Sequence, residues 1–134
     1  MKSIATNISK TLIPGSVLTC ADNSGAKMIM IINKVGKGGG GKRGKLAASG
    51  IGDIFTGSVK AGSPEYIKKK VQAVIIRQKQ PIRRPNGMRV KFEDNACILV
   101  KEGGLPVGTE VKGPMAREVV EIYIKMAGVA SRVV

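Results

Sequence analysis

The chain alternates short apolar runs with clusters of turn-forming residues over its first hundred positions. These runs are rich in β-branched residues and are closed by Gly, Asn, Asp or Pro, which is typical of β-strands. They cover residues 16–20, 27–35, 50–60, 71–79, 88–92 and 96–101. Because no helical segments separate the runs in a βαβ rhythm, the pattern predicts a small closed barrel or a sandwich.

The fifth run carries the clearest periodic signal, since apolar and basic residues alternate along it with a period of two. Successive side chains of a strand point to opposite faces of the sheet. We therefore expect Met88, Val90 and Phe92 to face the core, and Arg89 and Lys91 to point away from it.

A hairpin is predicted between the fourth and fifth runs. The connecting segment, residues 81–87, ends in Asn86-Gly87, the strongest short signal for a hairpin turn. Arg83 and Arg84 precede this turn, so we expect both side chains near a protruding tip.

The apolar pattern changes after residue 112. Gly113 and Pro114 are followed by apolar residues at helical spacing, and proline is favoured at the first position of a helix. These apolar residues are Met115, Val119, Ile122, Tyr123 and Met126. We therefore predict one domain over residues 1–134, with a barrel and its basic loops over 1–105 and a C-terminal helical segment over 106–134 packed on it.

Composition narrows the chemistry that the chain can perform. There is no histidine, and the two cysteines, Cys20 and Cys97, have no metal-binding spacing, so the usual zinc sites lack ligands. The same absence excludes Ser-His-Asp and Cys-His catalysis, while acid/base chemistry by carboxylates or lysine stays open. Residues 1–14 hold no apolar run long enough for a signal peptide or a membrane span, which favours a cytoplasmic protein.

Net charge is concentrated in the middle of the chain. Residues 34–91 contain 15 basic residues and only two acidic ones, Asp53 and Glu65, a balance of +13 out of a total of +14. Like charges held together destabilise a monomer, so such a region indicates a polyanionic partner. Nucleic acid is favoured over an anionic membrane, because the region reads as strands and turns rather than as a basic amphipathic helix.

Two clusters stand out in this basic region. Residues 36–43 satisfy G-x-G-x-x-G, but the chain beyond them is glycine-rich and leads into a strand, whereas a phosphate-binding loop opens a helix. We interpret this segment as a flexible basic loop that contacts phosphates through Lys37, Lys42, Arg43 and Lys45; a loop without a partner is the alternative. Lys68, Lys69 and Lys70 form the second cluster, in a loop or a single helical turn.

Aromatic residues make up only 3% of the chain, and this scarcity decides the kind of nucleic-acid binding. Binders of single strands stack bases on exposed rings. We expect Phe92 in the core, Phe55 in a strand and Tyr123 on the apolar stripe of the helix. Tyr66 is therefore the one candidate for stacking on a base. Recognition must then depend on phosphates and shape, which suits folded RNA or a duplex.

Three segments resemble one known family. The first reads VLTCADNSGAK at residues 17–27. The second comprises Ala73, Ile76, Arg77, Gln78, Pro81, Arg83, Arg84, Asn86 and Gly87, followed by VKFEDNA at residues 90–96. The third comprises Pro106, Gly108, Thr109, Gly113, Pro114, Ala116, Arg117 and Glu118. Together they resemble the universal large-subunit ribosomal protein family number fourteen, in its archaeal and eukaryotic branch. Two departures are Val107, where the family usually has a basic residue, and the four glycines from Gly38.

The resemblance implies an all-β protein with a small α part: a five-stranded closed β-barrel of Greek-key, OB- or SH3-like type, with a hairpin and short C-terminal helices. It also implies a structural, non-enzymatic constituent of the large ribosomal subunit in the cytoplasm, without cofactor or metal. The implied partners are large-subunit rRNA, ribosomal protein L3, the eukaryote-type L24 protein, small-subunit rRNA at intersubunit bridges and the anti-association initiation factor number six.

Charge and resemblance together define the candidate site residues. The expected RNA-binding residues are Lys37, Lys42, Arg43, Lys45, Lys68, Lys69, Lys70, Arg77, Lys79, Arg83, Arg84, Arg89 and Lys91. The expected protein-interface residues are Met115, Arg117, Val120, Tyr123 and Ile124. Two other functions stay open: a free-standing RNA chaperone, and an enzyme using the carboxylates of Asp53, Glu93 or Asp94, which fall in turns without an evident pocket.

Overall fold

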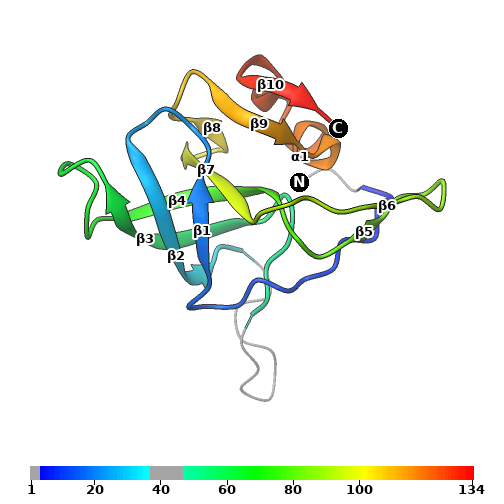
Figure 1. Ribbon diagram of the computed structural model, residues 1–134, viewed down its shortest axis with the longest axis horizontal. Helices are drawn as coiled ribbons and strands as arrows, with labels where there is room; N and C mark the ends of the chain where they lie inside the picture. Colours follow the sequence, from blue (N-terminus) through cyan, green and yellow to red (C-terminus); the bar gives the residue numbers. More distant parts are fainter. Residues whose placement is uncertain (1–3, 37–46) are drawn as a thin grey trace.

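Five strands form a closed β-barrel in the computed structural model, which describes residues 4–36 and 47–134. They are β1 (Val17–Cys20), β2 (Ala26–Lys34), β3 (Ile54–Gly62), β4 (Lys70–Arg77) and β7 (Ala96–Lys101). Neighbours in the order β1-β2-β3-β4-β7 run antiparallel, and a parallel pair between β7 and β1 closes the barrel (Figure 1). The closure decides between the barrel and the sandwich that the sequence left open.

The barrel core is mostly aliphatic, as the composition requires, with Phe55 and Phe92 as its buried aromatic residues. In β3, Phe55 and Val59 are buried while Thr56 and Ser58 are half-buried, so the strand has one face inside and one outside. The second half of β4 and all of β7 except Lys101 are instead buried, because the C-terminal elements cover their outer side. The backbone N–H of Ala116 donates to the carbonyl of Ile76 at 3.1 Å and ties this cover to the barrel.

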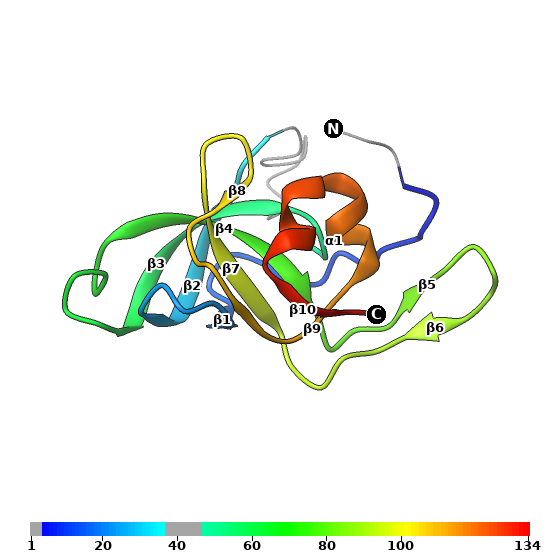
Figure 2. The same cartoon turned by 90° about the horizontal axis from the view of Figure 1, so that it is seen from above.

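A narrow hairpin extends from the barrel between β4 and β7. It consists of β5 (Ile82–Arg83) and β6 (Arg89–Val90), which pair antiparallel, with Gly87 at φ +87° in the connecting turn (Figure 2). The prediction that Met88 faces the core is wrong, because its side chain is 62% exposed. The tip of the hairpin extends beyond the core, whereas Ile82 in β5 and Phe92 at the base of the hairpin are buried, Phe92 as expected.

The C-terminal segment is less helical than the sequence predicted. It contains β8 (Leu105–Pro106), β9 (Val111–Met115), α1 (Arg117–Ile122), the 3-10 helix η1 (Ile124–Gly128) and β10 (Ala130–Val133). β9 and β10 pair in parallel, and the Asp22–Val111 bridge joins β9 to the barrel.

The predicted helix start at Gly113 and Pro114 is wrong, since both residues lie in β9. Gly113 has φ +80°, and a Cβ there would meet the Arg77 guanidinium at 2.8 Å, so this glycine makes room for a buried arginine. The expected apolar stripe is nevertheless largely inside, with Met115, Val119 and Met126 fully buried.

Candidate nucleic-acid interface

Four exposed cations gather on and beside the β5–β6 hairpin. They are Lys79, Arg83, Arg89 and Lys91, and we call them the hairpin surface. Arg83 and Arg89 are direct cross-strand partners, so two like charges stand opposite each other on one face of the hairpin. Such pairs destabilise a free hairpin. Their presence therefore indicates an anionic partner rather than a contribution to folding.

The hairpin turn has a defined conformation. The N–H of Arg84 donates to the carbonyl of Met88, and the N–H of Gly87 donates to the carbonyl of Arg84, both at 2.9 Å. Asn86 adds a side-chain acceptor for the N–H of Met88 at 3.0 Å. The sequence signal of Asn86-Gly87 is confirmed, and the turn holds the adjacent arginines in fixed positions.

A second cluster of exposed cations lies at the turn between β3 and β4. Lys68, Lys69 and Lys70 are all exposed, and we call them the turn surface. Lys68 adopts φ 65°, and its N–H donates to the carbonyl of Val59 at 3.0 Å while the carbonyl of Lys69 accepts from the N–H of Val59 at 3.2 Å. These bonds continue the β3–β4 ladder into the turn, so the lysines are presented from the end of the barrel.

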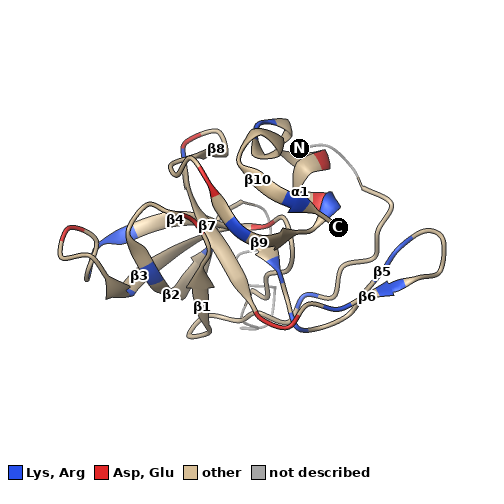
Figure 3. Cartoon of the chain, turned by 45° about the horizontal axis from the view of Figure 1, so that its top comes forward, with Lys and Arg blue, Asp and Glu red and all other residues tan. Residues whose placement is uncertain are grey.

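The two surfaces lie at opposite ends of the molecule's longest axis (Figures 1 and 3). Figure 3 shows basic segments at both ends, with an acidic segment also at the tip of the β3–β4 turn, where Glu65 is exposed. Within residues 4–36 and 47–134, the ion pairs engage Lys10, Lys34, Arg77 and Arg84, and none of the cations of either surface. The exposed cations therefore remain available to an external anion.

Arg77 is one predicted RNA contact that the structure places inside the protein. This residue is 8% exposed, and its Nε and Nη2 donate to Asp94 at 2.7 and 3.2 Å. Its Nη1 donates to the carbonyls of Lys112 and Pro114 at 3.0 and 2.9 Å. Arg77 thus joins β4, β9 and the segment before β7, and its donors are used within the chain.

Arg84 is a second predicted RNA contact whose side chain is mostly buried. Its side chain is 15% exposed, and Nε lies 3.1 Å from Oε1 of Glu118 in α1. Its Nη2 donates to the carbonyl of Val134. Adjacent arginines in the sequence, Arg83 and Arg84, therefore have different environments, which no periodic signal distinguishes.

The predicted loop residues Lys37, Lys42, Arg43 and Lys45 lie outside the described residues. The segments on either side of that loop are held by Asp53, whose Oδ2 pairs with Lys10 at 2.7 Å and with Lys34 at 3.1 Å. Burial acts to raise the pKa of the Asp53 carboxyl, but the Lys10, Gly50 and Lys34 donors outweigh it and hold the pKa below its ordinary value.

The carboxylates considered as catalytic groups are mostly engaged. Asp53 is bound by two lysines and Asp94 by Arg77, while Glu93 is exposed. The expectation that these turns lack a pocket is wrong in one respect. A cleft of about 600 Å³ is lined by Arg77, Lys91, Phe92, Glu93, Asp94 and Pro114. Since Asp94 is committed to Arg77, the cleft offers no pair of free carboxylates.

The predicted protein-interface residues divide into exposed and buried groups. Arg117 is exposed and Ile124 is 78% exposed, which is high for a large apolar side chain. Val120 and Tyr123 are half-buried, and the Tyr123 hydroxyl donates to the carbonyl of Gly52 at 3.3 Å. Burial, together with the nearby charge of Asp53, raises the pKa of the Tyr123 hydroxyl.

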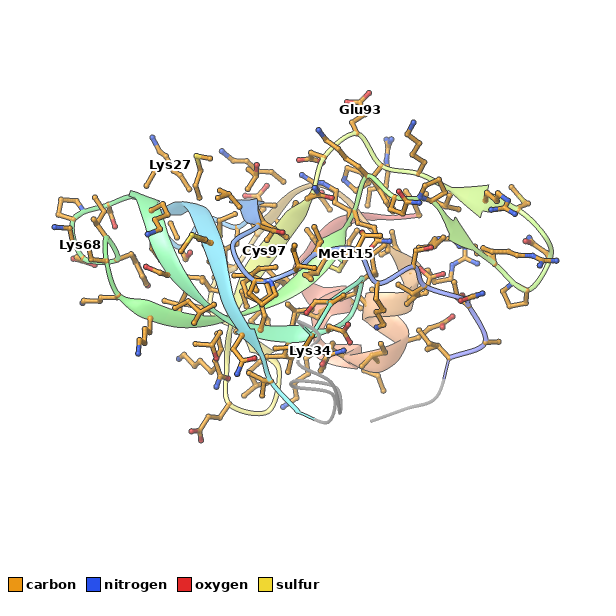
Figure 4. All side chains as sticks on the ribbon, turned by 90° about the horizontal axis from the view of Figure 1, so that it is seen from below. Lys27, Lys34, Lys68, Glu93, Cys97 and Met115 are labelled. Atoms are coloured by element: carbon orange, nitrogen blue, oxygen red, sulfur yellow. The ribbon has the colours of Figure 1, made fainter. Side chains whose placement is uncertain are left out.

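Met115 departs from that interface prediction. It is the last residue of β9, and its side chain is fully buried in the core. Figure 4 shows Met115 and Cys97 in the interior, whereas Lys68 and Glu93 lie at the periphery. Arg117, Val120, Tyr123 and Ile124 remain on the outside, and we call these four residues the C-terminal surface.

Membrane spans and metal clusters are both missing from the described part of the chain. None of its helices is long and apolar enough to cross a membrane. The described residues also contain no group of three or more Cys, Asp or Glu side chains arranged to hold a metal ion. The carboxylate of Asp22, for example, accepts from Ser24 and from the N–H of Leu99 and organises the β1–β2 turn.

Comparison with known proteins identifies the family. The family model described as ribosomal protein L14p/L23e matches residues 11–134. The large ribosomal subunit protein uL14 of Methanoregula boonei is 47% identical over 134 residues, and that of Thermoplasma acidophilum is 48% identical over the same length. Both alignments cover all of each chain, as does one with Halobacterium salinarum at 44%. The chain belongs to the L14p/L23e family of ribosomal proteins.

Proposed function

We propose that the chain is a structural constituent of the large ribosomal subunit that binds large-subunit rRNA through phosphate and shape contacts. The observation that carries this proposal is the pair of exposed basic surfaces at opposite ends of the barrel. Their cations have no acidic partners among the described residues. Exposed cations of this kind exchange counterions for phosphates, which drives binding to RNA.

The aromatic residues support recognition of folded RNA rather than of single strands. The chain contains two Phe and two Tyr residues and no Trp. Phe55 and Phe92 are buried, and Tyr66 and Tyr123 are half-buried against the core. Because none of these four rings is exposed for stacking, binding must use the phosphate backbone and the shape of the RNA.

We also propose a protein-docking role for the C-terminal surface. Its most exposed apolar residue, Ile124, is the first residue of η1, and the exposed Arg117 lies at the start of α1. The proposed partners are the anti-association initiation factor number six at this surface, and ribosomal protein L3 and the eukaryote-type L24 protein elsewhere on the barrel. Small-subunit rRNA would be contacted at intersubunit bridges.

The same proposal covers the domain and the cellular setting. We propose that residues 1–134 act as one domain, because the barrel and the C-terminal elements share a continuous core. We further propose that the protein works on cytoplasmic ribosomes and is not an enzyme. The ion pairs of Asp53 and Asp94 support the second point, since they leave no free buried carboxylate pair among the described residues.

Sedimentation of a tagged chain tests the proposed function. After lysis at moderate salt, the protein should sediment with the large subunit on a sucrose gradient and should remain there when the subunits are separated. A free RNA chaperone would instead spread over many RNAs and leave the ribosome fraction as salt rises. A soluble pool without any large-subunit fraction would contradict the proposal.

A further inference from the structure

Glu118 is the buried carboxylate at which three distant segments of the chain meet. The residue lies in α1 and is 2% exposed. Its Oε1 accepts from the Thr6 hydroxyl at 3.0 Å and from Arg84 Nε at 3.1 Å. Thr6 belongs to the segment before β1, residues 4–16, which we call the N-terminal arm. Arg84 belongs to the hairpin turn, so one oxygen joins the arm, the hairpin and the helix.

These contacts lie beyond the part of the hairpin that the core holds, since Ile82 of β5 is fully buried and Val90 of β6 packs against the core. The strands of the hairpin, β5 and β6, are two residues long each, and isolated two-stranded hairpins are marginally stable in water. Beside the Arg84 contacts, Arg83 exchanges two backbone hydrogen bonds with Asn7 of the arm, at 2.9 and 3.1 Å. The arm that carries Asn7 is itself held to α1 by the adjacent Thr6.

Direct contact with RNA does not explain why Glu118 lies at this position. A carboxylate beside a basic surface repels phosphates, and burying it requires compensation by hydrogen bonds and an opposite charge. Oε2 of Glu118 has no hydrogen-bond partner among the described residues, so the carboxylate is not fully satisfied. A buried ion pair of this kind is better explained by the geometry that it imposes than by a gain in stability.

We propose that Glu118 is the positioning residue of the hairpin surface, which aims Arg83 and Arg89 at RNA by holding Arg84 and Thr6. Arg84 is then a tether and not a phosphate contact. This inference rests on the proposed function, because it assigns a role within the same RNA-binding surface. It predicts that removing a negative charge from the protein weakens its binding to a polyanion.

The sign of that effect provides the test. The full chain carrying Glu118→Gln is titrated with protein-free large-subunit rRNA and compared with the unmodified chain. Simple electrostatics predicts tighter binding for the variant, whose net charge is more positive. The positioning role predicts binding up to about tenfold weaker, because Gln keeps an oxygen that can accept from Thr6 and Arg84 but loses the charge that strengthens both hydrogen bonds.

Two matched variants separate geometry from charge. Glu121→Gln removes an exposed acid from the same helix and should leave the affinity unchanged or slightly higher. Arg84→Lys keeps the net charge but removes the Nε donor, and it should weaken binding as Glu118→Gln does. Equal or tighter RNA binding by Glu118→Gln, or an unchanged affinity for Arg84→Lys, would overturn the proposal.

Hydrogen exchange provides a readout that does not depend on RNA. In Glu118→Gln the amides of Arg84 and Gly87, which are bonded in the turn, should exchange faster. Amides of β4 and β7 should be unchanged, which shows that the barrel stays folded. If the unmodified chain fails to bind rRNA, the proposed function fails, whereas unchanged exchange at Arg84 and Gly87 overturns the positioning role itself.

Discussion

The turn surface and the hairpin surface present similar cations in structurally different ways. Lys68, Lys69 and Lys70 lie where two long barrel strands meet, so the barrel ladder itself holds them. Arg83 and Arg89 lie on a two-residue ladder that extends beyond the barrel and is tethered by an arm and by a buried ion pair. The two surfaces therefore differ in their support: the barrel ladder carries the turn surface, whereas the hairpin surface has additional contacts to the N-terminal arm and to the buried Glu118.

The largest expected effect comes from neutralising three of the four cations of the hairpin surface. Replacing Arg83, Arg89 and Lys91 by Gln should lower the log-log slope of rRNA affinity against salt by up to about 2.7, at about 0.9 for each lost phosphate contact. Thermal stability should hold or rise slightly, because the Arg83–Arg89 repulsion disappears. Titrations at several salt concentrations check this, and an unchanged slope would show that the hairpin is not a contact surface.

Neutralising the turn surface tests whether the two ends are equivalent. Replacing Lys68, Lys69 and Lys70 by Gln removes as many charges as the hairpin variant does. We therefore expect the log-log slope of rRNA affinity against salt to fall by a similar or smaller amount, up to about 2.7. The same titration series measures it. A slope that changes for the hairpin variant alone would reduce the RNA-binding site to one end of the molecule.

Arg77→Gln tests whether this buried arginine contributes to the stability of the protein rather than to RNA binding. The substitution leaves two backbone carbonyls and Asp94 without their donors, and we expect a loss of about 2–3 kcal/mol in the free energy of unfolding. Urea denaturation measures that loss. At temperatures where the variant is folded, the salt slope of RNA binding should not change, and a slope reduced by a full contact would return Arg77 to the interface.

The smallest expected effect is on the pH dependence of protein stability when the Asp53 carboxylate is removed. The folded-state pKa of Asp53 is lowered, so its ionised form stabilises the protein at neutral pH and this contribution is lost as pH falls through the folded pKa, below about pH 4. Asp53→Asn should therefore be less stable at neutral pH and less sensitive to acid. Thermal unfolding at pH 3 and pH 7 checks the sign of the difference.

The sequence predicted the barrel strands well because their signals are local. Alternating burial, turn residues and the Asn86-Gly87 dipeptide act within a few positions, and the strands appear close to the expected ranges. The errors lie where tertiary contacts override that pattern. Met88 alternates like a core residue but lies at the tip of the hairpin, beyond the core, and Gly113-Pro114 resembles a helix start but lies in a strand beside Arg77.

The sequence predicted which region is basic, but it did not predict which basic residues bind within the chain and which are exposed. Charge density identified the basic region, and the exposed lysines and arginines of both surfaces lie in it. The roles of Arg77 and Arg84 could not be read from the chain, because their partners, Asp94 and Glu118, are brought near by folding. Thr6 and the role of Glu118 were missed altogether, since neither residue belongs to the basic region.

A density map of the chain on the large ribosomal subunit tests the central claim most directly. We predict that the side chains of the hairpin surface and the turn surface both lie within hydrogen-bonding distance of rRNA phosphates, while Arg77 and Arg84 keep their internal partners. A map in which both surfaces face solvent or protein, with no phosphate near Arg83, Arg89 or Lys68, would contradict this claim.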